Sequence, residues 1–275
     1  MSASAAAIPT LLLVGCGKMG GALLRGWRAH GLAERYVVVE PGPGGAEFAG
    51  QPSVAVVPGT DELSPDLRPA VVVLAVKPQT MGQVLPGYRR FARTGALFLS
   101  IAAGKTLSYL ARELGAAAPV VRAMPNTPAA IGRGIAVACA SAAVGPAPRA
   151  LAEGLLAAVG EVGWVEDEAL IDAVTAVSGS GPAYVFLLIE CLAKAAVAAG
   201  LPEPLALRLA RATVTGSGEL ARVSEASAAE LREAVTSPGG TTRAALDVLM
   251  AKDGLEPLLT RAVLAAAQRS RELAE

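Results

Sequence analysis

Val14-Gly15-Cys16-Gly17-Lys18-Met19-Gly20 is a G-x-G-x-x-G sequence that follows an apolar run, residues 11–14, and opens a segment of helical periodicity, residues 18–30. In that context the first glycine allows a tight turn, the second lets the backbone approach a pyrophosphate, and the third lets helix and strand pack closely. The diphosphate would lie at the positive end of the helix. The pattern favours a cofactor site over an ordinary strand–helix turn, and it predicts a dinucleotide-binding loop formed by Gly15, Gly17, Lys18, Met19 and Gly20.

Along the first half of the chain, short apolar runs alternate with segments of helical periodicity. Several of the runs are continuously apolar, as is typical of parallel strands covered on both faces. The alternation predicts an α/β fold, a Rossmann-type doubly wound sheet. The expected strands are residues 11–14, 36–40, 54–57, 71–76, 96–101 and 120–123, and the expected helices are residues 18–30, 81–92, 106–114 and 148–159.

The character of the chain changes after Trp164, where helical periodicity takes over almost without interruption. We therefore place a dinucleotide-binding domain at residues 1–164 and an all-α domain at residues 165–275. Two turn sequences divide the second domain. Ser178-Gly-Ser-Gly-Pro182 is expected to interrupt two helices, and Ser227-Ala-Ala-Glu230 has the pattern of a capping box.

Composition limits the classes of function. The chain has 275 residues, of which 53% are hydrophobic and 4% aromatic, and its 24 basic and 24 acidic residues are balanced. No basic block is present, so nucleic acid is not an expected partner. An Ala-rich chain with so little charge has more apolar surface than one monomer easily buries, so we expect a homo-oligomer that acts on a small molecule.

Residue types that bind metals or form disulfides are scarce. Cys16, Cys139 and Cys191 are far apart without C-x-x-C spacing, and His30 is the single histidine. These counts argue against a disulfide framework, a metal site and Ser–His catalysis; they predict a cytoplasmic protein in which Cys139 and Cys191 are small core residues. Residues 1–10 lack the basic start of a leader, and the uncharged residues 173–189 are broken by glycines and proline, so no membrane partner is expected.

Glu40 follows Gly20 by twenty residues and ends the second expected strand. A carboxylate at this place typically accepts hydrogen bonds from the ribose 2′- and 3′-hydroxyls of the adenosine half. A 2′-phosphate would bring about two negative charges beside it and would need an Arg or Lys, and none occurs between Arg35 and Arg68. The local residues therefore favour NADH over NADPH. The alternative is that Glu40 points to solvent from the Gly/Pro-rich residues 41–45.

Three later strand ends carry further candidates, because the carboxyl ends of strands line the ligand crevice of an open α/β sheet. In Ala75-Val76-Lys77-Pro78, the lysine either holds a ribose hydroxyl or phosphate or is an ordinary surface lysine. The small residues Ala102 and Ala103 leave room for a nicotinamide ring. Asn126, between two prolines, either donates to substrate or cofactor or caps the turn that follows it.

The helical half contains a second candidate site. Ser237-Pro238-Gly239-Gly240-Thr241-Thr242 leads into a helix that is expected from about Thr241. Two glycines before a helix N-terminus expose several backbone N–H groups in one concavity, which suits a carboxylate, and the threonines add hydroxyl donors. The alternative, a threonine as a simple N-cap, leaves the two glycines unexplained.

Together these segments resemble the pyrroline-5-carboxylate reductase family in order and spacing along nearly the whole chain. The first motif is shared by many dehydrogenases, whereas the last three together are highly specific. The segments that carry the resemblance are Val14-Gly-Cys-Gly-Lys-Met-Gly20, Ala75-Val-Lys-Pro78, Ser100-Ile-Ala-Ala-Gly104, Arg122-Ala-Met-Pro-Asn-Thr-Pro128, Val177-Ser-Gly-Ser-Gly-Pro-Ala-Tyr-Val-Phe186 and Ser237-Pro-Gly-Gly-Thr-Thr242.

The resemblance implies a Rossmann domain followed by an all-α dimerisation domain that interlocks with a partner's. It implies a homodimer, often assembled further into a ring of dimers such as a homodecamer. The site would form where the cofactor domain of one subunit meets helical-domain residues from across the dimer. The implied activity is an oxidoreductase that reduces 1-pyrroline-5-carboxylate, a cyclic imine, to L-proline with NAD(P)H in the last step of proline biosynthesis.

By the same resemblance, Thr242 is the catalytic hydroxyl that hydrogen-bonds the ring nitrogen. Ser237 and the backbone of Gly239, Gly240 and Thr241 would bind the substrate carboxylate. Protonation of the imine makes C5 electrophilic, so hydride transfer needs no histidine acid, and loss of Thr242 should lower activity without abolishing it. The family usually uses NADPH, whereas Glu40 favours NADH.

Two other functions fit part of the sequence. In a β-hydroxyacid dehydrogenase-like reductase, a helical-domain lysine acts on an alcohol, and Lys194 is the candidate. That scheme leaves residues 237–242 without a role, and an exposed lysine is commonly just solvated. In a non-catalytic NAD(P)-sensing protein the dinucleotide is only a signal, and such a protein needs no carboxylate site. Turnover of the cyclic imine against 3-hydroxyacids distinguishes the three functions.

Overall fold

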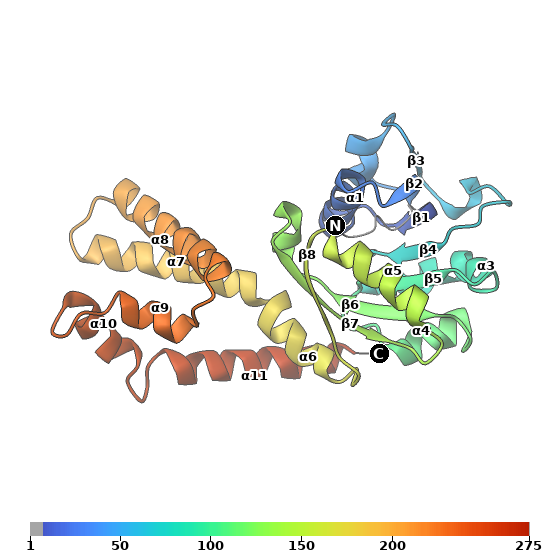
Figure 1. Cartoon of the computed structure of the whole chain (residues 1–275). Coiled ribbons are helices and arrows are strands. Elements are labelled where there is room, and N and C mark those ends of the chain that lie inside the picture. The colour runs from blue at the N-terminus through green and yellow to red at the C-terminus, as the bar shows by residue number, and fades with distance from the viewer. Residues whose placement is uncertain (1–7, 275) are drawn as a thin grey trace. The chain divides into compact units, whose positions relative to one another are not determined.

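The computed structural model describes residues 8–274 and divides the chain into two compact units (Figure 1). The first unit comprises residues 1–179 and 266–275, and the second comprises residues 180–265. The division falls beyond the boundary expected at Trp164, because helix α6 (Leu170–Val174) still belongs to the first unit, where its Ile171 is buried. The expectation that residues 1–10 are not a leader lies largely outside the described residues.

The first unit is built on one sheet of eight strands in the order β3-β2-β1-β4-β5-β6-β7-β8. Neighbours among β1 to β6 pair in parallel, β7 is antiparallel to β6, and β8 is parallel to β7. The winding of the sheet reverses between β1 and β4, so the doubly wound fold is confirmed. The strands are β1 Ile8–Val14, β2 Ala33–Val39, β3 Val54–Val57, β4 Val71–Leu74, β5 Leu97–Ser100, β6 Val120–Met124, β7 Gly134–Ala140 and β8 Gly160–Trp164.

Helices cover both faces of this sheet. Leu13 of β1 belongs to a core cluster with α1 and α5, whereas its neighbour Leu12 belongs to a cluster with α2, α3 and α4. Alternate strand residues therefore meet different helices, which explains why the strands are apolar on both faces. The helices of this unit other than α6 are α1 Lys18–Ala29, α2 Met81–Val84, α3 Arg89–Ala92, α4 Leu107–Leu114 and α5 Pro146–Ala157.

Helix α1 carries the glycine loop at its N-terminus and is fixed by its buried side. Gly20, Leu23 and Trp27 are buried at spacings of three and four residues, as in an amphipathic helix. The indole nitrogen of Trp27 donates a hydrogen bond to the carbonyl oxygen of Leu155 at 2.8 Å, which satisfies the polar atom of this buried ring. The chain turns just after the helix at Gly31, whose φ of +62° is a left-handed conformation.

Two parts of this unit differ from the sequence expectation. The helix expected over residues 81–92 is divided into α2, a 3-10 turn (Leu85–Tyr88) and α3, because Pro86 has no N–H for the helical ladder. Strands β7 and β8 extend the sheet beyond the last expected strand. They are rich in glycine and alanine, which have low strand propensity, so the strand signal of residues such as Ile135 and Val137 is weak.

The second unit consists of helices, of which α7 and α8 pack against each other. Helix α9 begins with the expected capping box: Glu230 N donates to Ser227 Oγ at 3.2 Å, and Ser227 N donates to Glu230 Oε2 at 2.7 Å. The helices are α7 Gly181–Ala198, α8 Glu203–Val223, α9 Ala228–Ala234, α10 Thr241–Leu249 and α11 Leu255–Leu273, whose last turns belong to the first unit.

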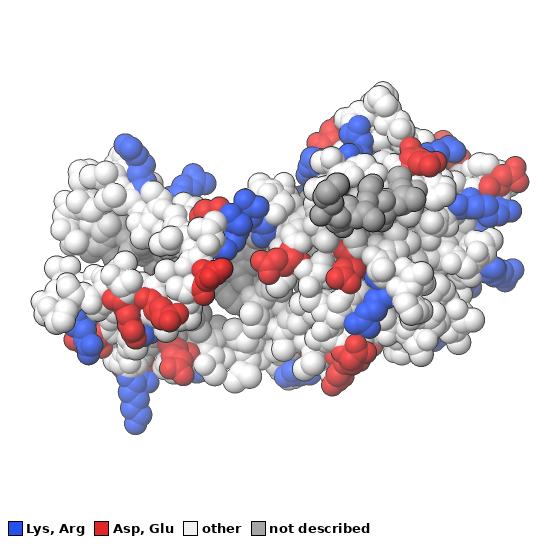
Figure 2. Space-filling model, in the orientation of Figure 1, with Lys and Arg blue, Asp and Glu red and all other residues white. Residues whose placement is uncertain are grey.

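Large apolar side chains of the second unit are mostly exposed. Among residues 180–265, all of which are described, the buried apolar residues are Ala193, Ala206 and Ala210. Much of the surface over α8 on the face shown in Figure 2 is uncharged. Cys139 is buried as expected. Cys191 was also expected to be a small core residue, and this prediction is wrong, because Cys191 is exposed on α7.

The chain remains helical across the junction between α6 and α7. Residues 178–182 were expected to interrupt the helices, but Thr175–Gly179 form a π-helical turn and α7 follows almost at once. Within residues 8–274, Leu170–Ala198 is the one helical stretch that is long and apolar enough to cross a membrane by length and composition. The expected absence of a membrane partner therefore stays a prediction.

Candidate active site

The glycine loop lies at the carboxyl ends of the parallel strands, beside a cavity of about 600 Å³ in the first unit. The N–H of Gly15 donates to the carbonyl oxygen of Val39 at 2.9 Å, and the N–H of Ala75 donates to that of Val14 at 2.8 Å. These bonds hold the ends of β1, β2 and β4 side by side where the winding reverses. The lining contains the expected Gly15, Gly17, Glu40, Ala75, Val76 and Lys77 together with Pro41, Thr60, Thr80, Gln83 and Tyr88.

The three glycines of the loop are required for different reasons. Gly15 has a φ of +90°, and a Cβ there would lie 2.8 Å from the carbonyl oxygen of Ala75. A Cβ on Gly20 would collide with the carbonyl oxygen of Gly15. A Cβ on Gly17 would meet no atom within 4 Å. The fold itself therefore needs Gly15 and Gly20, whereas Gly17 leaves open the space where a pyrophosphate would meet the N-terminus of α1.

The carboxylate of Glu40 is held at the edge of this cavity. It accepts hydrogen bonds from the backbone N–H of Cys16 at 2.6 Å and from that of Gly42 at 2.8 Å. Both donors belong to loops that border the cavity, so the side chain is fixed next to the glycine loop. The alternative in which Glu40 points freely to solvent is therefore wrong.

Cys16 lies within the glycine loop but is not a candidate catalytic group. Its side chain is buried, and this burial, with the Glu40 carboxylate as the second cause, raises the pKa of the thiol to about 11. The protonated thiol is a poor nucleophile at neutral pH. Within the described part of the chain, no group of three His, Cys, Asp or Glu side chains is placed to hold a metal ion.

Residues 75–78 carry the end of β4 into a 3-10 turn, Pro78–Thr80. The hydroxyl of Thr80 donates to the carbonyl oxygen of Lys77 at 2.9 Å and fixes this turn. The side chain of Lys77 is exposed and borders the same cavity as Glu40. The strand end thus presents its backbone and one cation to the cavity.

Lys18 and Met19 occupy the first positions of α1. Lys18 is exposed, and Met19 is half-buried against the core of the first unit. Neither side chain is among those that line the cavity. Their contribution to a dinucleotide would come from the backbone N–H groups at the helix N-terminus.

The loop after β5 contains the two alanines expected beside a nicotinamide ring. Ala102 is buried and Ala103 is exposed. Gly104 has a φ of +74°, and a Cβ there would lie 2.7 Å from the carbonyl oxygen of Leu273, near the end of α11. The end of α11 therefore packs closely against this loop and restricts its conformation.

The loop after β6 contains Asn126, which immediately precedes a 3-10 helix, Thr127–Ile131. Its side-chain oxygen accepts a hydrogen bond from the N–H of Ile135 at 3.0 Å and does not cap that helix. The capping alternative is therefore wrong. The bond fixes the amide plane and ties the loop to β7.

Sequence reasoning missed other residues that border the cavity. Thr60 follows the end of β3, so the rule that strand ends line the crevice could have found it. Gln83 lies on α2, and no local pattern marks it. The cavity is therefore bordered by strand ends and by α2, the short helix that follows β4 and residues 75–80.

A shielded ion pair lies next to the loops after β5 and β6. The guanidinium of Arg122 donates to Glu168 Oε1 at 2.7 Å, and the backbone N–H of Leu107 donates to the same oxygen at 2.7 Å. Arg122 is itself part of β6, where it pairs in register with Ser100. The sequence placed Arg122 in a family motif but gave no signal for Glu168, which lies between β8 and α6.

Residues 237–242 belong to the second unit and are described within it. Gly239 has a φ of +69°, and the N–H of Gly240 donates to the carbonyl oxygen of Ser237 at 3.1 Å, which closes a turn into α10. No side chain caps α10, so the N-cap alternative for a threonine is wrong. Thr241 is exposed and Thr242 half-buried. Backbone N–H groups at a helix start of this kind are available to an anion.

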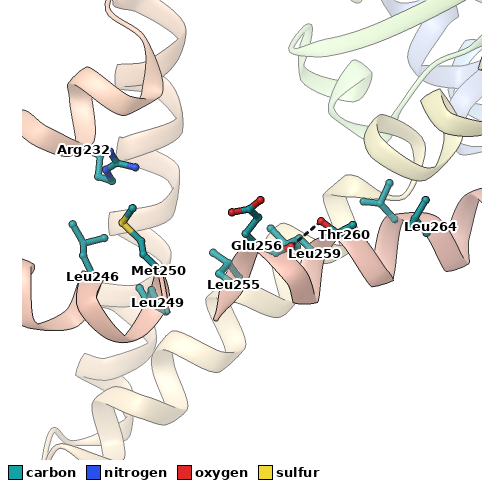
Figure 3. A pocket seen from close by; sticks show the side chains of 10 residues that line it. Arg232, Leu246, Leu249, Met250, Leu255, Glu256, Leu259, Thr260 and Leu264 are labelled. Atoms are coloured by element: carbon teal, nitrogen blue, oxygen red, sulfur yellow. Dashed lines mark hydrogen bonds between the residues drawn. The ribbon is translucent and has the colours of Figure 1, made fainter. Parts of the chain in front are cut away.

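A larger hollow, of about 710 Å³, lies between α9, α10 and α11 in the second unit (Figure 3). Apart from Arg232, Glu256 and Thr260 its lining is apolar, and the hydroxyl of Thr260 bonds to the backbone of Glu256 at 3.0 Å. The apolar residues that line it are Leu246, Leu249, Met250, Leu255, Leu259, Val263 and Leu264. This lining suits apolar contact better than catalysis. Lys194, the candidate of the hydroxyacid alternative, is exposed on α7.

Two family models match this chain. A model described as pyrroline-5-carboxylate reductase dimerisation matches residues 168–273. A model described as coenzyme F420-dependent NADP oxidoreductase matches residues 10–104. The first match includes the whole second unit, and the second includes the glycine loop and the loop of Ala102 and Ala103.

Relatives and solved structures agree over nearly the whole chain. The pyrroline-5-carboxylate reductase of Pseudomonas aeruginosa is 44% identical over 97% of each chain. The structure of a pyrroline-5-carboxylate reductase from Coxiella burnetii has a TM-score of 0.89 at 35% identity and covers 96% of this chain and 98% of its own. A pyrroline carboxylate reductase from Plasmodium falciparum, with NADP bound, has a TM-score of 0.80 at 29% identity and covers 98% of both chains.

Proposed function

This chain belongs to the pyrroline-5-carboxylate reductase family, and we propose from this premise that it reduces 1-pyrroline-5-carboxylate to L-proline, the last step of proline biosynthesis. The observation that carries the proposal is the likeness to a reductase of that name over 97% of each chain. The likeness includes both candidate sites, the glycine loop and residues 237–242. A nicotinamide dinucleotide is the cofactor that fits the geometry of the first unit.

A bound reduced dinucleotide supplies the hydride for this reaction. Hydride adds to C5 of the protonated imine, and the π electrons of the C=N bond become the lone pair of the ring nitrogen. The nitrogen keeps its proton, so the product is a secondary amine and no further acid is needed. The tasks left to the protein are to bind, orient and shield the two reactants.

The substrate groups are those of residues 237–242. We expect the hydroxyl of Thr242, which is half-buried at the start of α10, to hydrogen-bond the ring nitrogen. The hydroxyl of Ser237 and the N–H groups of Gly239, Gly240 and Thr241 bind the carboxylate, whose charge is favoured at a helix N-terminus. These contacts orient the imine and do not change its protonation. This is sufficient, because the hydride comes from the cofactor and no protein group has to supply a proton.

We assign the exposed apolar surface of the second unit to a second copy of this chain. The dimerisation model matches residues 168–273 and therefore includes this unit. Exposed leucines, valines and Phe186 on its helices, and the apolar hollow of Figure 3, are the surface that a partner would cover. Residues 237–242 then complete the site across the dimer. Sedimentation or light scattering measures the assembly and distinguishes a dimer from a homodecamer.

The cofactor preference that we propose is NADH. Glu40 is fixed by Cys16 and Gly42 beside the cavity, where its carboxylate can accept the ribose hydroxyls and opposes a 2′-phosphate. Among the lining residues, all within the described range, Lys77 is the one cation. The relative from Plasmodium falciparum has NADP bound, so this chain would differ from it at the ribose site.

Steady-state reduction of 1-pyrroline-5-carboxylate with NADH and with NADPH, in the wild type and in Glu40→Ala, tests the proposed function. We expect a higher kcat/KM with NADH in the wild type. We expect Glu40→Ala to lower the NADH preference by about tenfold, because the ribose hydroxyls lose a charged acceptor and the 2′-phosphate loses an opposing charge.

Glu47→Ala is the matched control, since Glu47 lies on the same segment but pairs with Arg25 and is not among the lining residues. It should leave the preference unchanged. If the wild type prefers NADPH, the account of Glu40 is wrong and the reductase activity stands. If neither cofactor reduces the imine while 3-hydroxyacids are oxidised, the proposed reaction is wrong.

A further inference from the structure

Glu168 is the point at which three segments of the first unit meet. One of its carboxylate oxygens accepts a hydrogen bond from the guanidinium of Arg122 on β6 at 2.7 Å and another from the backbone N–H of Leu107, the first residue of α4, at 2.7 Å. The pair is shielded, since the side chain of Arg122 is 5% exposed and that of Glu168 is 26% exposed. Glu168 itself precedes α6, so one carboxylate ties β6, α4 and α6 together.

The two partners of Glu168 adjoin the loops expected at the nicotinamide end of the site. Leu107 closes the loop that contains Ala102 and Ala103, and Arg122 lies four residues before Asn126. Arg122 is in register with Ser100, the last residue of β5, so the two loops leave the sheet from neighbouring strand ends. Moving Glu168 would therefore shift the bases of both loops at once.

We propose that Glu168 is a positioning residue that fixes residues 101–106 relative to residues 124–128 and so places the nicotinamide ring for hydride transfer. This inference rests on the proposed function. Glu168 acts through Arg122 and Leu107 and is not itself in contact with the reactants. A displacement of 1 Å can cost about a hundredfold in rate, so the effect falls on hydride transfer and on binding of the nicotinamide half. The adenosine half, near Glu40, is unaffected.

Leu107→Pro isolates the backbone donor to Glu168. Proline is accepted at the first position of a helix, and Thr106 before it already has an extended backbone, with φ −76° and ψ 161°. Leu107→Ala is the matched control, because it also shortens the side chain but keeps the N–H. We expect Leu107→Pro to bind NADH about tenfold more weakly than Leu107→Ala, with the same Tm.

Glu168→Gln removes the charge that pairs with Arg122. Its control is Glu113→Gln, because Glu113 is 22% exposed and pairs with Arg89 at 2.9 Å at the other end of α4. We expect kcat to fall by about tenfold in Glu168→Gln and to stay unchanged in Glu113→Gln. If Glu168→Gln fails to fold, the Leu107 pair of variants decides the question alone.

Binding of NADH is compared with binding of ADP-ribose, which lacks the nicotinamide. The proposal holds if Leu107→Pro and Glu168→Gln weaken NADH and leave ADP-ribose at its wild-type affinity. It is overturned if both ligands weaken together as Tm falls, because Glu168 then only stabilises the fold, or if neither ligand changes. These binding measurements need no imine. A wild type that binds NADH but does not reduce the imine would overturn the proposed reaction, and the role of Glu168 in binding could still be measured.

Discussion

The two units of this chain use their apolar residues in opposite ways. In the first unit, large side chains such as Trp27, Tyr88 and Phe98 are fully buried between the sheet and its helices. In the second unit only alanines are buried, while Phe186 is 59% exposed and Met250 is 61% exposed. The first unit has a complete core within one chain, whereas the second needs another apolar surface to cover it.

If the proposed sites are right, this difference means that the dinucleotide site and the substrate site are made rigid in different ways. The dinucleotide groups are placed by strand ends whose core is internal to the chain. The proposed substrate groups at residues 237–242 lie on helices whose large apolar side chains are exposed, and in our proposal a second copy of the chain stabilises these helices. Damage to the second unit should therefore change assembly and turnover while dinucleotide binding persists.

Phe186→Glu is expected to have the largest effect, because it places a charge on the apolar surface of α7. Burying an unpaired carboxylate opposes association, and we expect the dimer Kd to rise by about a hundredfold or more. Imine reduction should then be lost at protein concentrations where the wild type is dimeric, whereas NADH should still bind. Sedimentation, NADH titration and turnover of one sample measure the three quantities.

Lys194→Glu is the control for that substitution, since it adds a carboxylate to α7 at a position that is already charged and exposed. It should remain dimeric and active. A Phe186→Glu protein that stays dimeric with full turnover would show that α7 is not covered by a second copy. A parallel loss of NADH binding would show that the two units do not act separately.

Gly20→Ala and Gly17→Ala test how the first unit uses its internal core. A Cβ at Gly20 would collide with the carbonyl oxygen of Gly15, so Gly20→Ala should cost about 1–3 kcal/mol of stability and also weaken NADH. A Cβ at Gly17 meets nothing within 4 Å, so Gly17→Ala should keep the wild-type Tm and weaken NADH alone, by about tenfold or more. Thermal melts and NADH titrations check both. Equal loss of Tm in the two variants would contradict the separate roles.

Alkaline pH should destabilise the first unit through Cys16. Burial raises the pKa of its thiol from 9.0 to about 11 in the folded protein. A thiol with a raised folded pKa stabilises the fold fully below pH 9.0, and that contribution is lost as pH rises towards about 11. Urea unfolding should therefore show falling stability over this range, and Cys16→Ala should remove that part of the slope. An unchanged slope in Cys16→Ala would show that the thiol does not contribute.

Features that depend on neighbouring residues could be predicted from the sequence. The glycine loop, the capping box at Ser227 and the turn before α10 are each coded within a few residues, and the structure has all three. Continuous apolar runs likewise predicted strands buried on both faces. The low charge and high alanine content predicted more apolar surface than one monomer buries, and the structure exposes such surface on the helices of the second unit.

Features that depend on distant contacts could not be predicted. Glu168 meets Arg122 and Leu107 across 46 and 61 positions of the chain, and no local pattern encodes such a contact. β7 is a strand because β6 and β8 pair with it, although its own residues have weak strand propensity. The π-helical turn before α7 could not be predicted either. Its residues overlap Ser-Gly-Ser-Gly-Pro, a local pattern that favours an interruption of the helix, yet the chain stays helical there.

The smallest effect we predict comes from helix caps, one in each unit. Ser227→Ala removes the capping box of α9, and Thr106→Ala removes the hydroxyl that accepts from Tyr109 N at 3.1 Å at the start of α4. Each should cost about 1 kcal/mol. If the second unit is stabilised by a second copy, the melting temperature of that unit depends on protein concentration. Ser227→Ala should lower the melting temperature of the second unit, and Thr106→Ala should lower that of the first unit. Calorimetry at two concentrations measures this, and a single transition that both variants lower equally would mean that the two units unfold as one.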